Sequence, residues 1–201
     1  MFPMFVKLAG RPCLLVGAGR VGEGKLQSLL RAGARLTVVA PKATARVQRL
    51  AKLGEIVWRK RNFSARDLSG MLLVVAATSS HATNAGIFKQ ARQCGVLCNA
   101  VDDPSHCDFY YPAVLRRGDL QIAISTGGAS PELASRLRKE LESCFGPDYG
   151  PWLSYLGRRR EEVIRAALPL TERRRILGQL ASRPAFQRFL RGPKTGREGK
   201  E

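Results

Sequence analysis

The sequence of 201 residues lacks long apolar runs, closely paired cysteines and enough acidic residues to balance its basic ones. Its apolar stretches, such as residues 71–77, are far shorter than the roughly 20 residues that a membrane-spanning helix needs. The first seven residues also lack the basic segment that opens a secretory signal peptide. We therefore expect a cytoplasmic protein with no membrane-inserted part.

The cysteines give no pattern typical of a metal site or a disulfide framework. Their number is odd, no two form a CxxC pair, and no secretion signal precedes them. One of them lies in an apolar segment, as buried free thiols often do. We expect free thiols and no bound metal at Cys13, Cys94, Cys98, Cys107 and Cys144.

The shortage of acidic residues leaves a formal net charge of +18, from 34 Lys and Arg against 16 Asp and Glu. The excess is spread along the chain, with 21 basic and 11 acidic residues in 1–150 and 13 and 5 in 151–201. A field of this sign attracts nucleic acids, anionic lipids or polycarboxylate substrates. A solvated basic surface would give the same composition, so charge alone does not choose a partner.

Short apolar segments alternate with helical patterns over the first half of the chain. Strands are expected at 11–16, 35–40, 55–58, 71–77 and 96–98, with helices at 21–32, 42–53 and 84–94. Pro41 is expected to end the second strand. The alternation predicts an α/β fold, a Rossmann-like open parallel sheet with helices on both faces.

The pattern changes after about residue 113. An alternating strand at 120–125 precedes an amphipathic helix at 130–144, in which Ser130 is the expected N-cap and Pro131 the first helical residue. Basic helices, broken near Pro169 and Pro184, follow from residue 151. We expect three parts: a nucleotide-binding Rossmann domain at 1–113, a small α+β segment at 114–147, and a basic helical region at 148–201 with a frayed tail.

The first strand runs into a G-x-G-x-x-G turn made by Gly17, Gly19 and Gly22. In this position the first glycine permits the tight turn, and the second lets the backbone approach a pyrophosphate at the helix N-terminus. The third allows close packing of helix against strand. The turn predicts a dinucleotide site. The next strand ends at Pro41 and Lys42 without the acid that usually binds the ribose hydroxyls, so the residues leave NAD and NADP open.

Two further loops carry chemistry at expected strand ends. Asp102 follows the fifth strand, where ligands of open α/β sheets bind, and Asn99 lies just upstream. An Asp-Asp-Pro run is also a common turn sequence. The second loop can bind a carboxylate or can simply connect a strand to a helix; it contains Ser125, Thr126, Gly127 and Gly128.

These motifs together resemble the precorrin-2 dehydrogenases, relatives of the N-terminal part of siroheme synthase. The resemblance covers roughly residues 3–145. It is carried by the order and spacing of GAGRVGEGK at 17–25, GARLTVVAP at 33–41, AAT at 76–78 with Asn84, NAVD at 99–102, FYYPA at 109–113 and STGGASP at 125–131.

The resemblance implies NAD-dependent oxidation of precorrin-2, a tetrapyrrole, to sirohydrochlorin, with Asp102 as general base. It also implies a homodimer whose interface is built by the segment after about residue 113. The implied cofactor contacts are Gly17, Gly19, Arg20, Val21, Gly22, Pro41, Lys42, Ala77 and Thr78. The implied substrate contacts are Asn99, Arg117, Ser125, Thr126, Gly127 and Gly128. Some relatives also insert Fe²⁺, and the sequence does not decide that question.

Two other functions fit parts of the sequence. A nucleotide-sensing Rossmann module would share the glycine turn, but such modules normally carry an acid after the second strand. A nucleic-acid-binding role would use the arginine runs at 158–160 and 173–175. That role predicts steeply salt-dependent DNA binding by residues 151–201 alone.

Overall fold

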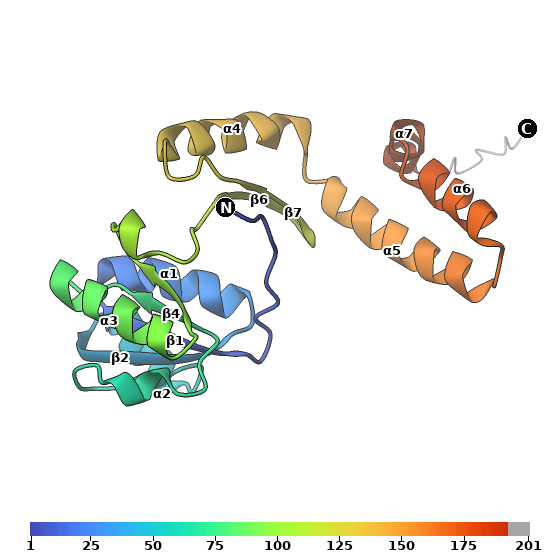
Figure 1. Ribbon diagram of the computed structural model, residues 1–201. Helices are drawn as coiled ribbons and strands as arrows, with labels where there is room; N and C mark the ends of the chain where they lie inside the picture. The colour runs from blue at the N-terminus through green and yellow to red at the C-terminus, as the bar shows by residue number, and fades with distance from the viewer. Residues whose placement is uncertain (193–201) are drawn as a thin grey trace, which may run out of the picture. The chain divides into compact units, whose positions relative to one another are not determined.

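A five-stranded sheet organises the first part of the chain in the computed structural model, whose ribbon is drawn in Figure 1. Every strand pair in it is parallel, and the strand order is β3-β2-β1-β4-β5. This confirms the predicted Rossmann-like open sheet. The strands are β1 (Pro12–Ala18), β2 (Arg35–Ala43), β3 (Val57–Arg59), β4 (Leu73–Ala76) and β5 (Leu97–Ala100).

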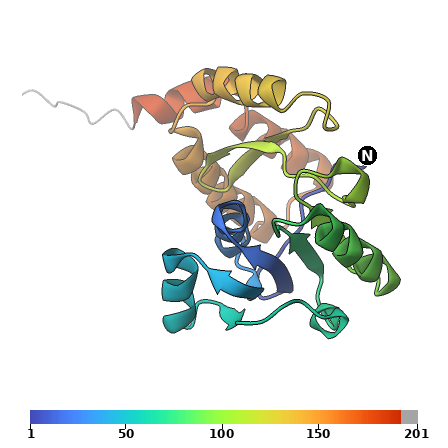
Figure 2. The ribbon, with the colours of Figure 1, turned by 90° about the vertical axis from the view of Figure 1, so that its left-hand side faces the viewer.

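Successive strand residues point to opposite faces and build two separate cores. Leu15, Val38 and Val75 pack with α1 (Arg20–Arg31) and α2 (Ala45–Lys52) on one face. Leu14 and Val74 pack with η1 (Ala65–Leu68) and α3 (His81–Gln93) on the other. Figure 2 shows these helices on the two sides of the sheet. Because both faces are covered, the central strands are apolar on both sides.

The end of β2 differs from the prediction. Pro41 does not stop the strand, which continues to Ala43, and the following helix starts at Ala45 rather than at Lys42. The register between β1 and β2 shifts at this point, from Val16 opposite Val39 to Ala18 opposite Ala43. Pro41 lies inside this irregularity, where a missing N–H disrupts the regular ladder least.

A second part of the chain combines a hairpin with four helices. Strands β6 (Ala113–Arg117) and β7 (Leu120–Ile124) pair antiparallel, and α4 (Pro131–Cys144) packs on them. Ser130 caps α4 through its side chain, as predicted. The remaining helices are α5 (Tyr149–Arg165), α6 (Leu170–Leu180) and α7 (Arg183–Arg191). The centroid of the Phe186 ring on α7 lies 4.5 Å from that of Tyr149 and 4.7 Å from that of Trp152, so this ring joins α7 to α5.

The structure describes residues 1–192, so the frayed tail predicted for the C-terminus lies largely outside the described residues. The chain is divided into two compact units, and the boundary lies between Tyr111 and Pro112. Over residues 1–192, no helix has both the length and the apolar composition that crossing a bilayer requires.

Candidate functional site

The glycine turn is packed against the end of β4. A Cβ on Gly17, whose φ is +96°, would lie 2.3 Å from the carbonyl oxygen of Ala77. A Cβ on Gly22 would lie 2.3 Å from the carbonyl oxygen of Gly17. Both distances are far below van der Waals contact, so these two positions accept only glycine without a backbone shift.

Gly19 differs from its two neighbours because it borders open space. A Cβ there would meet no described atom within 4 Å, and Gly19 is the N-cap of α1 without any side-chain cap. The first turn of a helix leaves N–H groups free, and the helix dipole makes this end positive. An uncapped helix end beside open space fits the pyrophosphate of a dinucleotide.

Thr78, directly after β4, is held by a buried amide. Asn84 of α3 is 3% exposed, and its Oδ1 accepts hydrogen bonds from the Thr78 backbone N–H at 3.1 Å and hydroxyl at 2.7 Å. Its Nδ2 donates to the Thr78 carbonyl at 3.2 Å. These bonds fix the segment against which Gly17 packs. The sequence pointed to Asn84 only as part of the family motif.

The remaining predicted cofactor contacts lie on the same unit. Arg20 and Val21 are exposed in the first turn of α1, and Pro41 and Lys42 are exposed at the end of β2. No acid lies between Ala40 and Gly54, so no carboxylate follows β2 where it would bind ribose hydroxyls.

Asp102 is exposed at a sharp turn after β5. The Val101 N–H donates to the Ala76 carbonyl at 2.9 Å, continuing the pairing of β5 with β4. The chain then turns, and Asp102 adopts a φ of +61°. Aspartate tolerates this left-handed region better than most residues, although it costs roughly 1 kcal/mol or more. A strained acidic residue at the carboxyl end of a parallel sheet is a candidate for proton transfer.

Asn99, the predicted substrate contact beside Asp102, lies inside β5 and is 6% exposed. Its amide donates to the Phe109 carbonyl at 2.8 Å and to the Cys107 sulfur at 3.2 Å. The Cys107 thiol in turn donates to the Ala100 carbonyl at 3.1 Å. These bonds hold the returning segment 107–109 against β5 and so fix both ends of the Asp102 turn.

Asp103, next to Asp102, belongs to a local network. Its carboxylate accepts from the Ser105 hydroxyl at 2.5 Å and lies 2.7 Å from His106 Nδ1. These hydrogen bonds, chiefly that from Ser105, lower the pKa of Asp103. The His106 ring meets Phe88 of α3 edge-on, with centroids 5.2 Å apart. The network anchors the turn to α3 and leaves Asp102 as its exposed carboxylate.

Lys25 is a half-buried cation of α1 that the residue-by-residue reasoning did not single out. Its Nζ lies 4.0 Å from the centroid of the Tyr111 ring. Burial is the main cause of a lowered pKa at Lys25.

The second unit carries the other predicted substrate contacts. Gly127 and Gly128 have φ of +67° and +90° and form the turn after β7. The Thr126 hydroxyl accepts from the Ser130 N–H at 3.1 Å, and the Ser125 hydroxyl accepts from the Gly127 N–H at 3.2 Å. These bonds within the loop hold it at the start of α4.

Arg117 binds the end of α4. Its guanidinium donates to the carbonyls of Phe145 at 2.8 Å and Glu142 at 3.4 Å, and also to that of Arg116 at 3.0 Å. A cation at a helix C-terminus also interacts favourably with the helix dipole. Arg117 thus joins β6 to α4, whatever further contact it makes.

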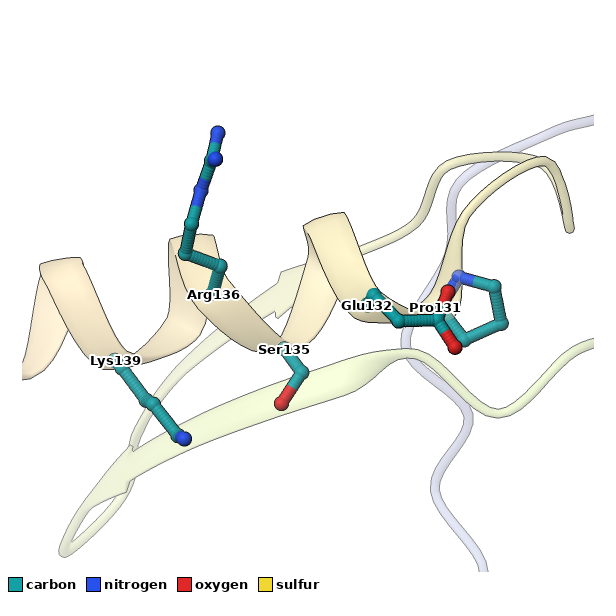
Figure 3. Close-up of a pocket in the computed structure, with 5 residues that line it drawn as sticks. All are labelled: Pro131, Glu132, Ser135, Arg136 and Lys139. Atoms are coloured by element: carbon teal, nitrogen blue, oxygen red, sulfur yellow. The ribbon is translucent and has the colours of Figure 1, made fainter.

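A hollow of about 490 Å³ lies along the first turns of α4. All five residues that line it come from this helix, and Figure 3 shows Ser135 and Lys139 pointing to one side and Arg136 to the other. None of the predicted site residues lines it, so we assign no function to this hollow. Among residues 1–192, no three His, Cys, Asp or Glu side chains gather as a metal ion would require.

The parallel sheet and the glycine turn at its carboxyl edge define a dinucleotide-binding Rossmann unit. Residues 4–113 match the family described as "Putative NAD(P)-binding", and the chain belongs to this family. Residues 117–143 match the family described as "Sirohaem biosynthesis protein central". The predicted family resemblance is therefore confirmed.

Two curated relatives are named siroheme synthase. The protein from Methylococcus capsulatus is 41% identical over 191 residues, which cover 95% of this chain and 38% of that protein. The protein from Neisseria meningitidis serogroup C is 40% identical over 175 residues, which cover 87% and 36%. The chain thus spans less than two fifths of the length of either relative.

A solved structure matches almost the whole chain. It is described as SirC, precorrin-2 dehydrogenase, and it superposes with a TM-score of 0.81 at 27% sequence identity. The match covers 94% of both chains. The likeness therefore includes the hairpin and the C-terminal helices as well as the Rossmann unit.

Proposed function

We propose that this chain oxidises precorrin-2 to sirohydrochlorin with NAD⁺. The observation that carries the proposal is the match to a precorrin-2 dehydrogenase over 94% of both chains. The sirohaem biosynthesis family at 117–143 and the siroheme synthase relatives support the same pathway. A nucleotide-sensing module is less well supported, because its glycine turn does not account for the sirohaem segment.

The cofactor contacts proposed are those at the carboxyl edge of the sheet. The backbone at Gly17, Gly19 and Gly22, with Arg20 and Val21, would bind the pyrophosphate, since the helix end there is open and uncapped. Pro41 and Lys42 would contact the adenosine end, and Ala77 and Thr78 the nicotinamide end. When bound, the nicotinamide accepts the hydride that leaves the substrate.

Asp102 is the proposed general base. Dehydrogenation removes two hydrogens from the macrocycle, one as a hydride and one as a proton, and a general base such as a carboxylate can accept the proton. Asp102 is exposed, whereas the neighbouring Asp103 carboxylate is engaged with Ser105 and His106. Asn99 supports this role by fixing the segment after the turn.

The substrate contact proposed on the first unit is Asn99, and those proposed on the second unit are Arg117 and the loop Ser125–Gly128. Precorrin-2 is a polycarboxylate, and the net charge of +18 would attract it. The Ser125–Gly128 loop precedes the N-terminus of α4, where a carboxylate is electrostatically favoured.

We also propose a homodimer formed through the second unit. Light scattering coupled to gel filtration tests this, and a monomer at every concentration would contradict it.

The activity is tested anaerobically with precorrin-2 and either NAD⁺ or NADP⁺, following sirohydrochlorin by its absorbance. We expect turnover with NAD⁺ and a higher kcat/KM than with NADP⁺. Absence of turnover by a chain that binds either nucleotide would contradict the proposal and favour the sensing module. Fe²⁺ or Co²⁺ added after sirohydrochlorin has formed shows whether the chain also inserts a metal.

A further inference from the structure

We propose that Glu23 and Arg46 set the preference of the nucleotide site for NAD⁺ over NADP⁺. The inference rests on the proposed function, because it concerns the nucleotide which that reaction uses. Glu23 lies in the first turn of α1 and Arg46 in the first turn of α2, and their side chains form an ion pair with 3.9 Å between Oε1 and Nη1. The pair thus joins the starts of the two helices that follow β1 and β2.

The position of Arg46 is fixed by the hydrogen bonds at the end of β2. The Thr44 N–H donates at 3.1 Å to the carbonyl of Ala18, which lies within the glycine turn. Thr44 is also the N-cap of α2, and its side chain accepts from the Val47 N–H at 3.3 Å. Arg46 therefore belongs to a segment that is hydrogen-bonded to the turn at which we propose that the dinucleotide binds.

The end of the second strand is where Rossmann proteins distinguish the two nucleotides. An acidic residue there binds the ribose 2′-hydroxyl of NAD, whereas a nearby arginine accommodates the 2′-phosphate of NADP. In this chain no acid lies at positions 41–54, while Lys42 and Arg46 are exposed cations. These basic residues by themselves would favour the 2′-phosphate.

Two side chains of α1 engage the Arg46 guanidinium and oppose this effect. Besides the Glu23 carboxylate, the Gln27 amide faces Arg46, and with its oxygen turned toward the guanidinium it accepts from Nη2 at 3.0 Å. The Arg46 side chain is 47% exposed, and ion pairs this exposed contribute little to stability. The effect on binding is larger, because a 2′-phosphate has to compete with the Glu23 carboxylate for the guanidinium and is repelled by its charge.

The preference is tested by calorimetric titration of the chain with NAD⁺ and with NADP⁺, which needs no turnover. Glu23→Gln removes the competing charge and keeps the size of the side chain. Its affinity for NADP⁺ should rise about tenfold, the effect of removing one nearby charge at a partly exposed site, while its affinity for NAD⁺ should change less than about twofold. Lys42 is present in every variant, so a difference reports on Arg46 and its partners.

Two further variants separate the ion pair from the overall charge of the chain. Combining Arg46→Met with Glu23→Gln should abolish the gain in NADP⁺ affinity, because the cation that binds the phosphate is then absent. Glu55→Gln makes the same change of charge at an exposed position after α2 and should leave both affinities unchanged. Unaltered NADP⁺ affinity in Glu23→Gln, or an equal gain in Glu55→Gln, would overturn the inference.

Failure of this inference can be distinguished from failure of the proposed function. If the wild type binds NAD⁺ but does not oxidise precorrin-2, the proposed function fails, while the NADP⁺ affinities still decide the roles of Glu23 and Arg46. If the wild type oxidises precorrin-2 with NAD⁺ and Glu23→Gln gains no affinity for NADP⁺, the inference alone fails. If the wild type binds neither nucleotide, both fail.

Discussion

The Asn84 side chain makes three hydrogen bonds to Thr78, two to its backbone and one to its hydroxyl. Since Asn84 is buried, these bonds replace water at the end of β4. The same segment packs against Gly17, whose missing side chain leaves room for the Ala77 carbonyl. Asn84 therefore connects the stability of the fold to the shape of the nucleotide-binding turn.

Asn84→Ala should lower the free energy of unfolding by about 2 kcal/mol, because it removes the three hydrogen bonds of a buried amide to the half-buried Thr78. Urea denaturation measures this loss, and calorimetric titration with NAD⁺ should show weaker binding. Asn62→Ala, at an exposed position, is the matched control and should change stability by less than about 0.5 kcal/mol. Equal stability of the two variants would contradict the assigned role of Asn84.

Alanine substitutions in the glycine turn should separate folding from binding. Gly22→Ala forces a Cβ against the Gly17 carbonyl and should lower the melting temperature markedly. Gly19→Ala meets open space, so the fold should survive while nucleotide affinity falls. Gly24→Ala, also in open space but inside α1, should raise stability by up to about 1 kcal/mol and leave binding unchanged. Unaltered nucleotide affinity in Gly19→Ala would contradict the proposed pyrophosphate site.

Acid should destabilise the Rossmann unit through Asp67. This buried carboxylate accepts hydrogen bonds from Arg61 and Arg59 at 2.6 Å each, and chiefly the Arg61 bond lowers its pKa from 3.8 to about 2. A lowered folded-state pKa gives stability that is present above pH 4 and is lost as pH falls from about 4 to about 2.

The loss over that interval should amount to about 2 kcal/mol for this one group. Asp67→Asn should remove this group's contribution to the pH dependence of the free energy of unfolding, whatever the substitution does to stability at neutral pH. Urea midpoints measured from pH 5 to pH 2 test this. The same decline in both proteins would show that another carboxylate is responsible.

The contact of Arg117 with the last turn of α4 should be detectable by hydrogen exchange. Arg117→Met removes the donors to the Phe145 and Glu142 carbonyls, and exchange at the end of α4 should become several-fold faster. Arg116→Met, at the exposed neighbouring position, should leave that exchange unchanged. Equal exchange in the two variants would show that the guanidinium does not hold α4.

Much of the fold could be predicted because local signals agreed with the final packing. Apolar strands, the glycine turn and the Ser130 cap each depend on residues close in sequence, and the structure has the parallel sheet and α4 where these signals placed them. The continuation of β2 past Pro41 could not be predicted in this way. It depends on the register shift against β1, which is a property of two strands together.

The site could be predicted less well than the fold, because its contacts also join residues that are far apart in the sequence. Lys25 and Tyr111 are separated by 85 intervening residues, and only packing brings the ammonium onto the ring. The bonds of Arg117 to carbonyls at 142 and 145 are equally non-local. The family motif identified Asp102 as a candidate. Its left-handed backbone, and the hydrogen bonds that engage the carboxylate of Asp103 and not that of Asp102, could be seen only in the folded turn.

The most direct test of the account is anaerobic oxidation of precorrin-2 with NAD⁺ by the wild type, Asp102→Asn and Asp103→Asn. Asp102→Asn keeps the size of the side chain but removes the proton acceptor. Its kcat should fall by about 10²- to 10⁴-fold, the usual contribution of a general base. Asp103→Asn should retain most of its activity, because that carboxylate only anchors the turn. Near-normal turnover by a folded Asp102→Asn variant that still binds NAD⁺ would contradict the central claim.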